Sequence, residues 1–249
     1  MHKNLYQKIA IAIFILPMFL FGTGFPSEYY KIKDVKEQKE YFSNLLVPMI
    51  EKTNSVILNE RDFVDRFFKA YTLRFFRKIP KNELSYLNLL KEKYRIELLF
   101  DKNAYLRKID AIPISLTLAQ ASIESGWGKS RFTRVANNIF GQWTWGKEGI
   151  VPEGRDEGKR HKIKIFKSLQ HSVDEYALNL NRHYAYKEFR KARKEAKDKG
   201  VHFDGLKAAK TMLYYSELRE KYVKMLEKVI EDSGFNVYDY KPAAFMASD

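Results

Sequence analysis

Hydrophobic positions recur at helical spacing from residue 27 to residue 110. The clearest case is a stripe of aromatic residues four positions apart, made by Phe63, Phe67 and Tyr71. Pro80 interrupts the pattern, and a second run without Gly or Pro continues to Phe100. This pattern predicts a helical N-terminal region over 27–110 that packs on the later part of the chain, and it gives no sign of chemistry.

The next apolar run, from Ile114 to Ser125, is hydrophobic on most sides. Its apolar residues fall on two faces, with Ile114, Leu118 and Ala121 on one and Leu116, Ala119 and Ile123 on the other. Pro113 suits the start of a helix, because its missing N–H would have no partner there. Gly126 is a natural stop. We therefore expect a largely buried helix over this run.

From Ile139 to Phe166 glycines recur, and the end of the segment alternates polar and apolar residues. This pattern predicts a β-hairpin with a basic loop at 152–160. Helical patterns then return in four runs: Ser172–Tyr184, Glu188–Lys199, Lys207–Leu213 and Ser216–Glu231. The second run is so highly charged that it indicates a solvated face, and residues 233–249 resemble a tail.

Charge and composition limit the classes of partner and the kinds of site that the chain can have. The formal net charge is +14, which favours a polyanionic partner such as nucleic acid, an acidic membrane face or a cell-wall polymer. The chain has no cysteine, so disulfides and thiolate metal sites are excluded.

The N-terminus has the pattern of a secretory signal. Lys3 and Lys8 precede an apolar stretch that ends in Gly22-Thr23-Gly24. We expect residues 1–26 to be a cleaved signal peptide, with an uncleaved membrane anchor as the alternative. In both cases the protein is exported, periplasmic or anchored facing the cell wall, which argues against nucleic acid as its partner.

Glu124 is the one acid in the apolar run, and it stands immediately before the Ser-Gly-Trp-Gly sequence that ends it. Apolar surroundings raise the pKa of a carboxyl, so Glu124 is a candidate general acid. The alternative is a structural carboxylate in a packed core. His161, His171 and His183 have no acidic or cysteine partners at metal-ligand spacing, so we expect no metal and no cofactor.

Several segments together resemble glycoside hydrolase family 73, the bacterial peptidoglycan glucosaminidases related to the flagellar wall-cutting domain. The similarity covers about 112–230 and rests on Leu118–Gly128, Asn137–Gly141, Phe166 with Ser172–Tyr176, and Tyr215–Glu217 with Tyr222-Val223. Asn179–His183 and the helical N-terminal region resemble the Bax-type members of Gram-negative bacteria.

The resemblance implies an α+β, mostly α fold, with a lysozyme-like domain over 111–232 that contains a small β-hairpin. It implies that Glu124 protonates the glycosidic oxygen. It also places Tyr215 beside the site. The family's second carboxylate would lie in the stretch 149–158, where neither Glu153 nor Glu157 stands in the family's sequence context. Glu153 is the candidate, and it would position water or balance the cation across the cleft. If Glu153 does not serve, the substrate's acetamido group is the alternative nucleophile.

The candidate substrate-binding residues are Trp127, Asn138, Phe140, Trp143, Trp145 and Tyr176. Trp127 is more typical of core, and Asn138 is typical of a residue that closes a turn. For Trp143 and Trp145, sugar stacking and core packing both stay open.

These observations predict an exported peptidoglycan hydrolase that cuts β-1,4 bonds after N-acetylglucosamine. The alternatives are a lytic transglycosylase, which works with a single acid, and a non-catalytic protein that binds peptidoglycan glycan strands. The sequence does not define an oligomeric state.

Overall fold

The computed structural model describes residues 24–152, 158 and 160–240. Nearly all of the expected signal peptide or anchor, 1–26, therefore lies outside the described residues, and so does Glu153. The described chain is mostly helical with one small antiparallel pair of strands, which confirms the expected α+β, mostly α class. Across the same residues, no helix combines the length and apolar character needed to span a membrane.

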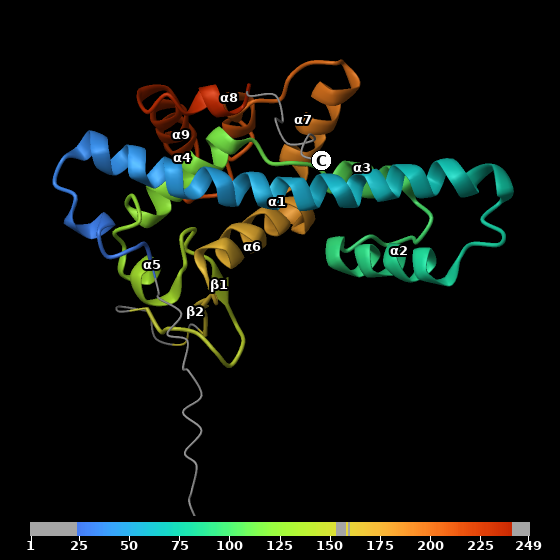
Figure 1. Cartoon of the computed structure of the whole chain (residues 1–249), viewed down its shortest axis with the longest axis horizontal. Helices are drawn as coiled ribbons and strands as arrows, with labels where there is room; N and C mark the ends of the chain where they lie inside the picture. The colour runs from blue at the N-terminus through green and yellow to red at the C-terminus, as the bar shows by residue number, and fades with distance from the viewer. Residues whose placement is uncertain (1–23, 153–157, 159, 241–249) are drawn as a thin grey trace, which may run out of the picture.

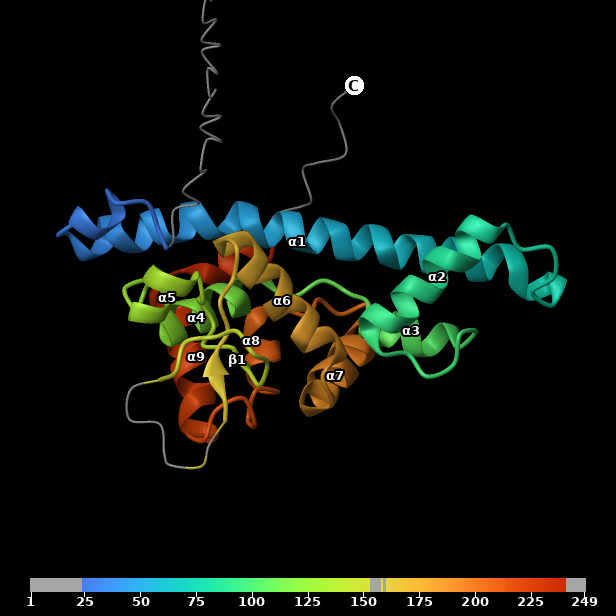
Figure 2. The same cartoon turned by 90° about the horizontal axis from the view of Figure 1, so that it is seen from below.

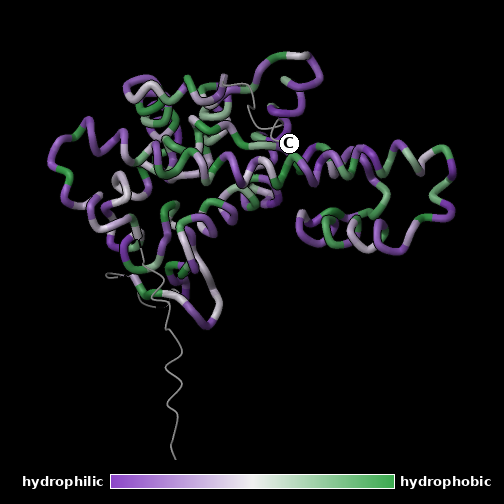
Figure 3. The backbone as a smooth tube through the Cα atoms, viewed as in Figure 1, coloured by the Kyte–Doolittle hydropathy of each residue, from purple (hydrophilic) through white to green (hydrophobic). Residues whose placement is uncertain are grey.

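A single long helix, α1 (Val35–Tyr71), lies along one side of the molecule (Figures 1 and 2). The helical region predicted over 27–110 includes all of α1, and the aromatic stripe lies in its C-terminal third. The backbone N–H of Glu37 donates to Asp34, which caps the start of α1. Hydrophobic and hydrophilic segments alternate along α1 in Figure 3, as expected for a helix with one buried face. That face packs on α3, α4 and α6.

The next helix, α2 (Lys81–Tyr94), folds back beside the far end of α1, where Phe63 and Tyr86 meet edge to face at 4.6 Å. The prediction that this helix continues to Phe100 was wrong. It ends at Tyr94, because Arg95 adopts a left-handed conformation with φ of 51°. The short helix α3 (Lys102–Lys108) comes next and packs under α1.

Helix α4 spans Ile114–Ser125, as the sequence predicts. It is enclosed by α1, by two C-terminal helices, α8 (Gly205–Ala209) and α9 (Glu220–Asp232), and by the 3₁₀ turn Phe235–Tyr238. Gly126 ends the helix in a left-handed conformation with φ of 55°, which few residues other than glycine adopt readily.

The expected hairpin is present but short. After α5 (Arg131–Ala136), strand β1 (Trp143–Thr144) pairs antiparallel with β2 (Lys162–Ile163). Helix α6 (Leu169–Arg182) then begins three residues earlier than the apolar pattern indicates, because Ser168 caps it by accepting from the N–H of His171.

Two expectations about the C-terminal part were wrong. Helix α7 (Lys187–Asp198) is not simply a solvated face, since Phe189, Arg190 and Arg193 are buried. Residues 233–240 are not a loose tail, because Phe235 is buried and Asp239 accepts hydrogen bonds from the N–H and hydroxyl of Ser115. The predicted helices near 207–213 and 216–231 are also shorter, being α8 and α9.

One continuous hydrophobic core runs from Phe25 to Phe235. The N-terminal helices and the segment that resembles the glucosaminidases therefore share buried side chains. Through this shared core, α1 packs directly against α4 and helps to fix its position.

Candidate active site

Glu124 stands in the last turn of α4 and is half-buried. Its Oε1 accepts a hydrogen bond of 2.7 Å from the hydroxyl of Tyr222 on α9. Its Oε2 lies toward Gly141, where an added Cβ would stand 3.8 Å from that oxygen. Gly141 has φ of +61°, a conformation that a side chain would strain. The two oxygens of this carboxyl thus have different surroundings.

Burial is the main influence on the pKa of Glu124 and raises it above the usual value. The hydrogen bond from Tyr222 opposes this effect but does not outweigh it. Among the described residues Glu124 has no ion-pair partner to stabilise its negative charge. The carboxyl therefore keeps its proton to a higher pH than an exposed Glu does, which suits a general acid.

A chain of hydrogen bonds leads to Glu124 from inside the domain. The Tyr176 hydroxyl donates to Oε1 of Gln120 at 2.5 Å, and Nε2 of Gln120 donates to the Tyr222 hydroxyl at 3.1 Å. Tyr222 in turn donates to Oε1 of Glu124. All three donors point the same way, so Oε1 is engaged as an acceptor. A proton on Glu124 then belongs on Oε2, the oxygen beside Gly141.

Tyr215 lies at this site, as the resemblance implies. Its ring stacks on that of Tyr222, with centroids 5.4 Å apart and an interplanar angle of 4°. Burial and the charges of Tyr222 and Glu124 raise the pKa of Tyr215 well above its usual value. Its hydroxyl therefore stays protonated at neutral pH and is available as a donor.

Three of the predicted substrate-binding residues lie beneath the surface. Phe140 and Tyr176 are buried and stack on each other at 3.9 Å. Asn138 is buried, and its amide donates to the carbonyls of Gln142 and Lys164, which ties the loop before β1 to the chain after β2. Their packing supports the site from behind and leaves their side chains no open surface toward a sugar.

The three tryptophans fall into two groups. Trp127 packs against Phe42 at 5.2 Å and Phe235 at 6.0 Å, so it belongs to the core. Trp143 and Trp145 are 54% and 73% exposed, with ring centroids 6.4 Å apart. They come two and four residues after Gly141. The Trp143 ring stacks on that of His161, with centroids 4.3 Å apart and an interplanar angle of 19°, so one of its faces is already covered. Trp145 is thus the candidate with the most ring surface open to a ligand.

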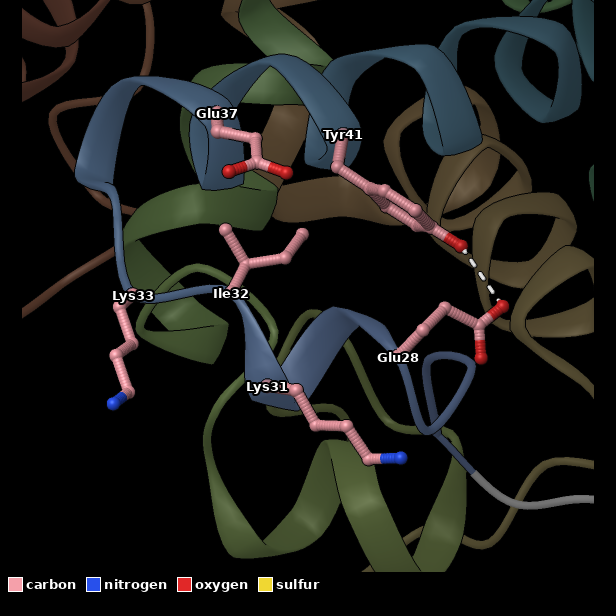
Figure 4. Close-up of a pocket in the computed structure, with 6 residues that line it drawn as sticks. All are labelled: Glu28, Lys31, Ile32, Lys33, Glu37 and Tyr41. Atoms are coloured by element: carbon pink, nitrogen blue, oxygen red, sulfur yellow. Dashed lines mark hydrogen bonds between the residues drawn. The ribbon is translucent and has the colours of Figure 1, made fainter.

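The remaining predictions concern carboxylates and metals. Glu153 lies outside the described residues, so the structure gives it no position. Within the described parts of the chain, no group of three or more His, Cys, Asp or Glu is placed to hold a metal ion. A surface hollow beside the first turns of α1, drawn in Figure 4, contains none of the predicted site residues. It is lined by Glu28, Lys31, Ile32, Lys33, Glu37 and Tyr41.

Gln120 and Tyr222 are the functional candidates that the sequence reasoning did not single out. Gln120 precedes Glu124 by four residues, so both side chains lie on the same face of α4. That spacing is a signal that could have identified Gln120. Tyr222 stood only in a matching segment, and its bond to Glu124 joins residues 98 positions apart.

Comparison with known proteins identifies the family of the chain. The profile of the Glucosaminidase family, described as mannosyl-glycoprotein endo-beta-N-acetylglucosaminidase, matches residues 101–234, more than half of the chain. Protein bax of Escherichia coli (strain K12) is 30% identical over 164 residues, which cover 63% of this chain and 55% of that protein. The chain thus spans just over half the length of this relative. No solved structure matches the chain.

Proposed function

Because the chain belongs to the glucosaminidase family, we propose that it hydrolyses the β-1,4 bonds after N-acetylglucosamine in peptidoglycan, with Glu124 as general acid. The observation that carries the proposal is a half-buried carboxyl of raised pKa at the end of α4, with one oxygen held by Tyr222. The leader pattern at the N-terminus supports an exported enzyme, outside the cytoplasm where peptidoglycan lies.

In the proposed reaction, Oε2 of Glu124 gives its proton to the glycosidic oxygen while the sugar C1 gains oxocarbenium character. Trp143 and Trp145 offer ring faces to the sugar, and Tyr215 offers its hydroxyl as a donor. Either Glu153 or the substrate's acetamido group completes the reaction. An inverted first product would identify Glu153 as a base that activates water, whereas a retained configuration fits nucleophilic attack by either Glu153 or the acetamido group.

Digestion of purified cell wall tests this function. We expect mass spectrometry of the soluble fragments to find reducing N-acetylglucosamine ends. Anhydro-muramyl ends would instead identify a lytic transglycosylase. Release of no fragments across a wide pH range, with the protein still bound to the wall, would identify a binding protein.

The hydrogen bond between Tyr222 and Glu124 predicts a shift in the pH profile. Activity should fall as pH rises through the pKa of Glu124, because the acid loses its proton. The Tyr222 hydroxyl stabilises the carboxylate, so Tyr222→Phe should raise this pKa and move the alkaline limb to higher pH. Initial rates at saturating substrate, measured across a range of pH for both proteins, give kcat against pH and so the shift.

The control for this profile is Tyr214→Phe, which removes a neighbouring exposed hydroxyl. Its alkaline limb should coincide with that of the wild type. If the alkaline limb of Tyr222→Phe stays at the same pH or moves to lower pH, the result would contradict the assignment of Glu124 as the titrating acid.

A further inference from the structure

The turn between α1 and α2 presents two unusually exposed apolar side chains. Leu73 is 88% exposed and Phe75 is 82% exposed, the highest values among the large hydrophobic residues of the described chain. In Figures 1 and 2 this turn lies at one end of the molecule, beyond the other helices and far from the site at α4. We call residues 69–81 the tip.

The tip is also strongly basic. It contains no acidic residue, and five exposed cations surround Leu73 and Phe75: Lys69, Arg74, Arg77, Lys78 and Lys81. Within the described chain none of the five forms an ion pair. Nearby acids on α1 are already paired, Asp62 with Arg66 and Asp65 with Lys102. Glu83, in the first turn of α2, hydrogen-bonds with Tyr71 of the tip, so one carboxylate lies beside five cations and the tip keeps a net positive charge.

The backbone holds this arrangement in place. Phe75 and Phe76 are both left-handed, with φ of 49° and 56°, which is unusual for aromatic residues. The second ring turns inward and stacks on Phe100 at 4.3 Å. Phe75 is left pointing away from the core, so its exposure is part of the folded turn.

We infer that the tip docks on the surface of an anionic phospholipid bilayer, with Leu73 and Phe75 inserted at the headgroup boundary. The exposed cations complement lipid phosphates, and each one near an anionic surface strengthens binding about fivefold. Burying each apolar side chain adds about tenfold or more. A convex point with two apolar residues inside a basic ring suits a lipid surface, whereas a protein interface has a larger apolar centre.

A local probe tests insertion independently of any membrane binding by residues 1–23. The full chain carrying Phe75→Trp is mixed with phosphatidylglycerol vesicles that contain brominated lipid, and the difference spectrum against the parent is recorded. We expect a blue shift and strong quenching at position 75, and neither with phosphatidylcholine vesicles. The matched control is Val237→Trp, at a residue 55% exposed elsewhere. Equal quenching at both positions, or none at position 75, would overturn the inference.

A second variant measures the energetic contribution. Leu73→Ser with Phe75→Ser should weaken partitioning into phosphatidylglycerol vesicles at least about tenfold, judged by sedimentation. Val35→Ser with Val237→Ser should leave partitioning unchanged, and circular dichroism checks that both pairs fold. If the tip variant partitions like wild type, or if wild type binds heparin but not the vesicles, the partner is not a bilayer.

Discussion

Replacing Glu124 with glutamine should lower kcat for peptidoglycan cleavage by about 10²–10⁴-fold. The amide keeps the shape of the side chain, and its oxygen can still accept the hydrogen bond from Tyr222. It has no acidic proton to give to the leaving oxygen, so the loss is specific to the chemical step. Release of soluble fragments from purified wall, followed at saturating substrate, measures the effect.

Glu83→Gln is the matched control for this variant. Glu83 is also a half-buried carboxylate, but it lies on α2, outside the segment that matches the family. The activity of Glu83→Gln should stay within about twofold of that of the wild type. Retention of more than about a tenth of the activity in Glu124→Gln, with both variants folded, would remove Glu124 from the role of general acid.

Local start and stop signals explain which elements the sequence predicted well. Pro113 and Gly126 bracket α4, and both signals act within a few residues of the helix they bound. The same local logic predicted the hairpin from an alternating pattern near Ile163. Glu124 stood out for a related reason, because a single acid in an apolar run needs an explanation wherever the run folds.

What the sequence could not predict depends on contacts between distant segments. The end of α2 at Tyr94 has no Gly or Pro to mark it, and Arg95 adopts its unusual conformation in the folded chain. The bond between Tyr222 and Glu124 requires α9 to pack on α4. Asp239 was assigned to a tail because its partner Ser115 lies 124 residues earlier.

The charged helix α7 is the most instructive of these cases. Its composition indicates a solvated surface, yet Arg193 is buried and every hydrogen bond it makes has a specific acceptor. Its guanidinium donates to the side-chain oxygen of Asn181 at 2.8 Å and to four backbone carbonyls, those of Arg107, Lys108, Asp110 and Ala111. These carbonyls belong to the last turn of α3 and to the segment that leads from it toward α4.

Charges complete the Arg193 site. Burial alone would raise the pKa of Asp110, but Arg193, Arg61 and Lys197 outweigh it and hold this pKa below its usual value. Burial lowers the pKa of Arg193 to about 10, so the guanidinium remains charged at neutral pH. The cluster thus joins α7 to α1 and to the segment before α4 through a buried cation whose donors are satisfied.

Arg193→Ala should therefore lower the free energy of unfolding by about 3–5 kcal/mol, because it leaves the side-chain oxygen of Asn181 and four backbone carbonyls without their buried donor. The carboxylate of Asp110 keeps its pairs with Arg61 and Lys197. Total stabilities of about 5–15 kcal/mol make this a large loss. Lys194→Ala, one residue along on the outer face, removes only an exposed pair with Asp198 and should cost about 0.3–0.5 kcal/mol. Urea unfolding measures both variants. Equal losses of unfolding free energy in the two variants would mean that Arg193 contributes no more to stability than a surface charge does. Apolar packing alone would then hold α7 against the segment that leads to α4.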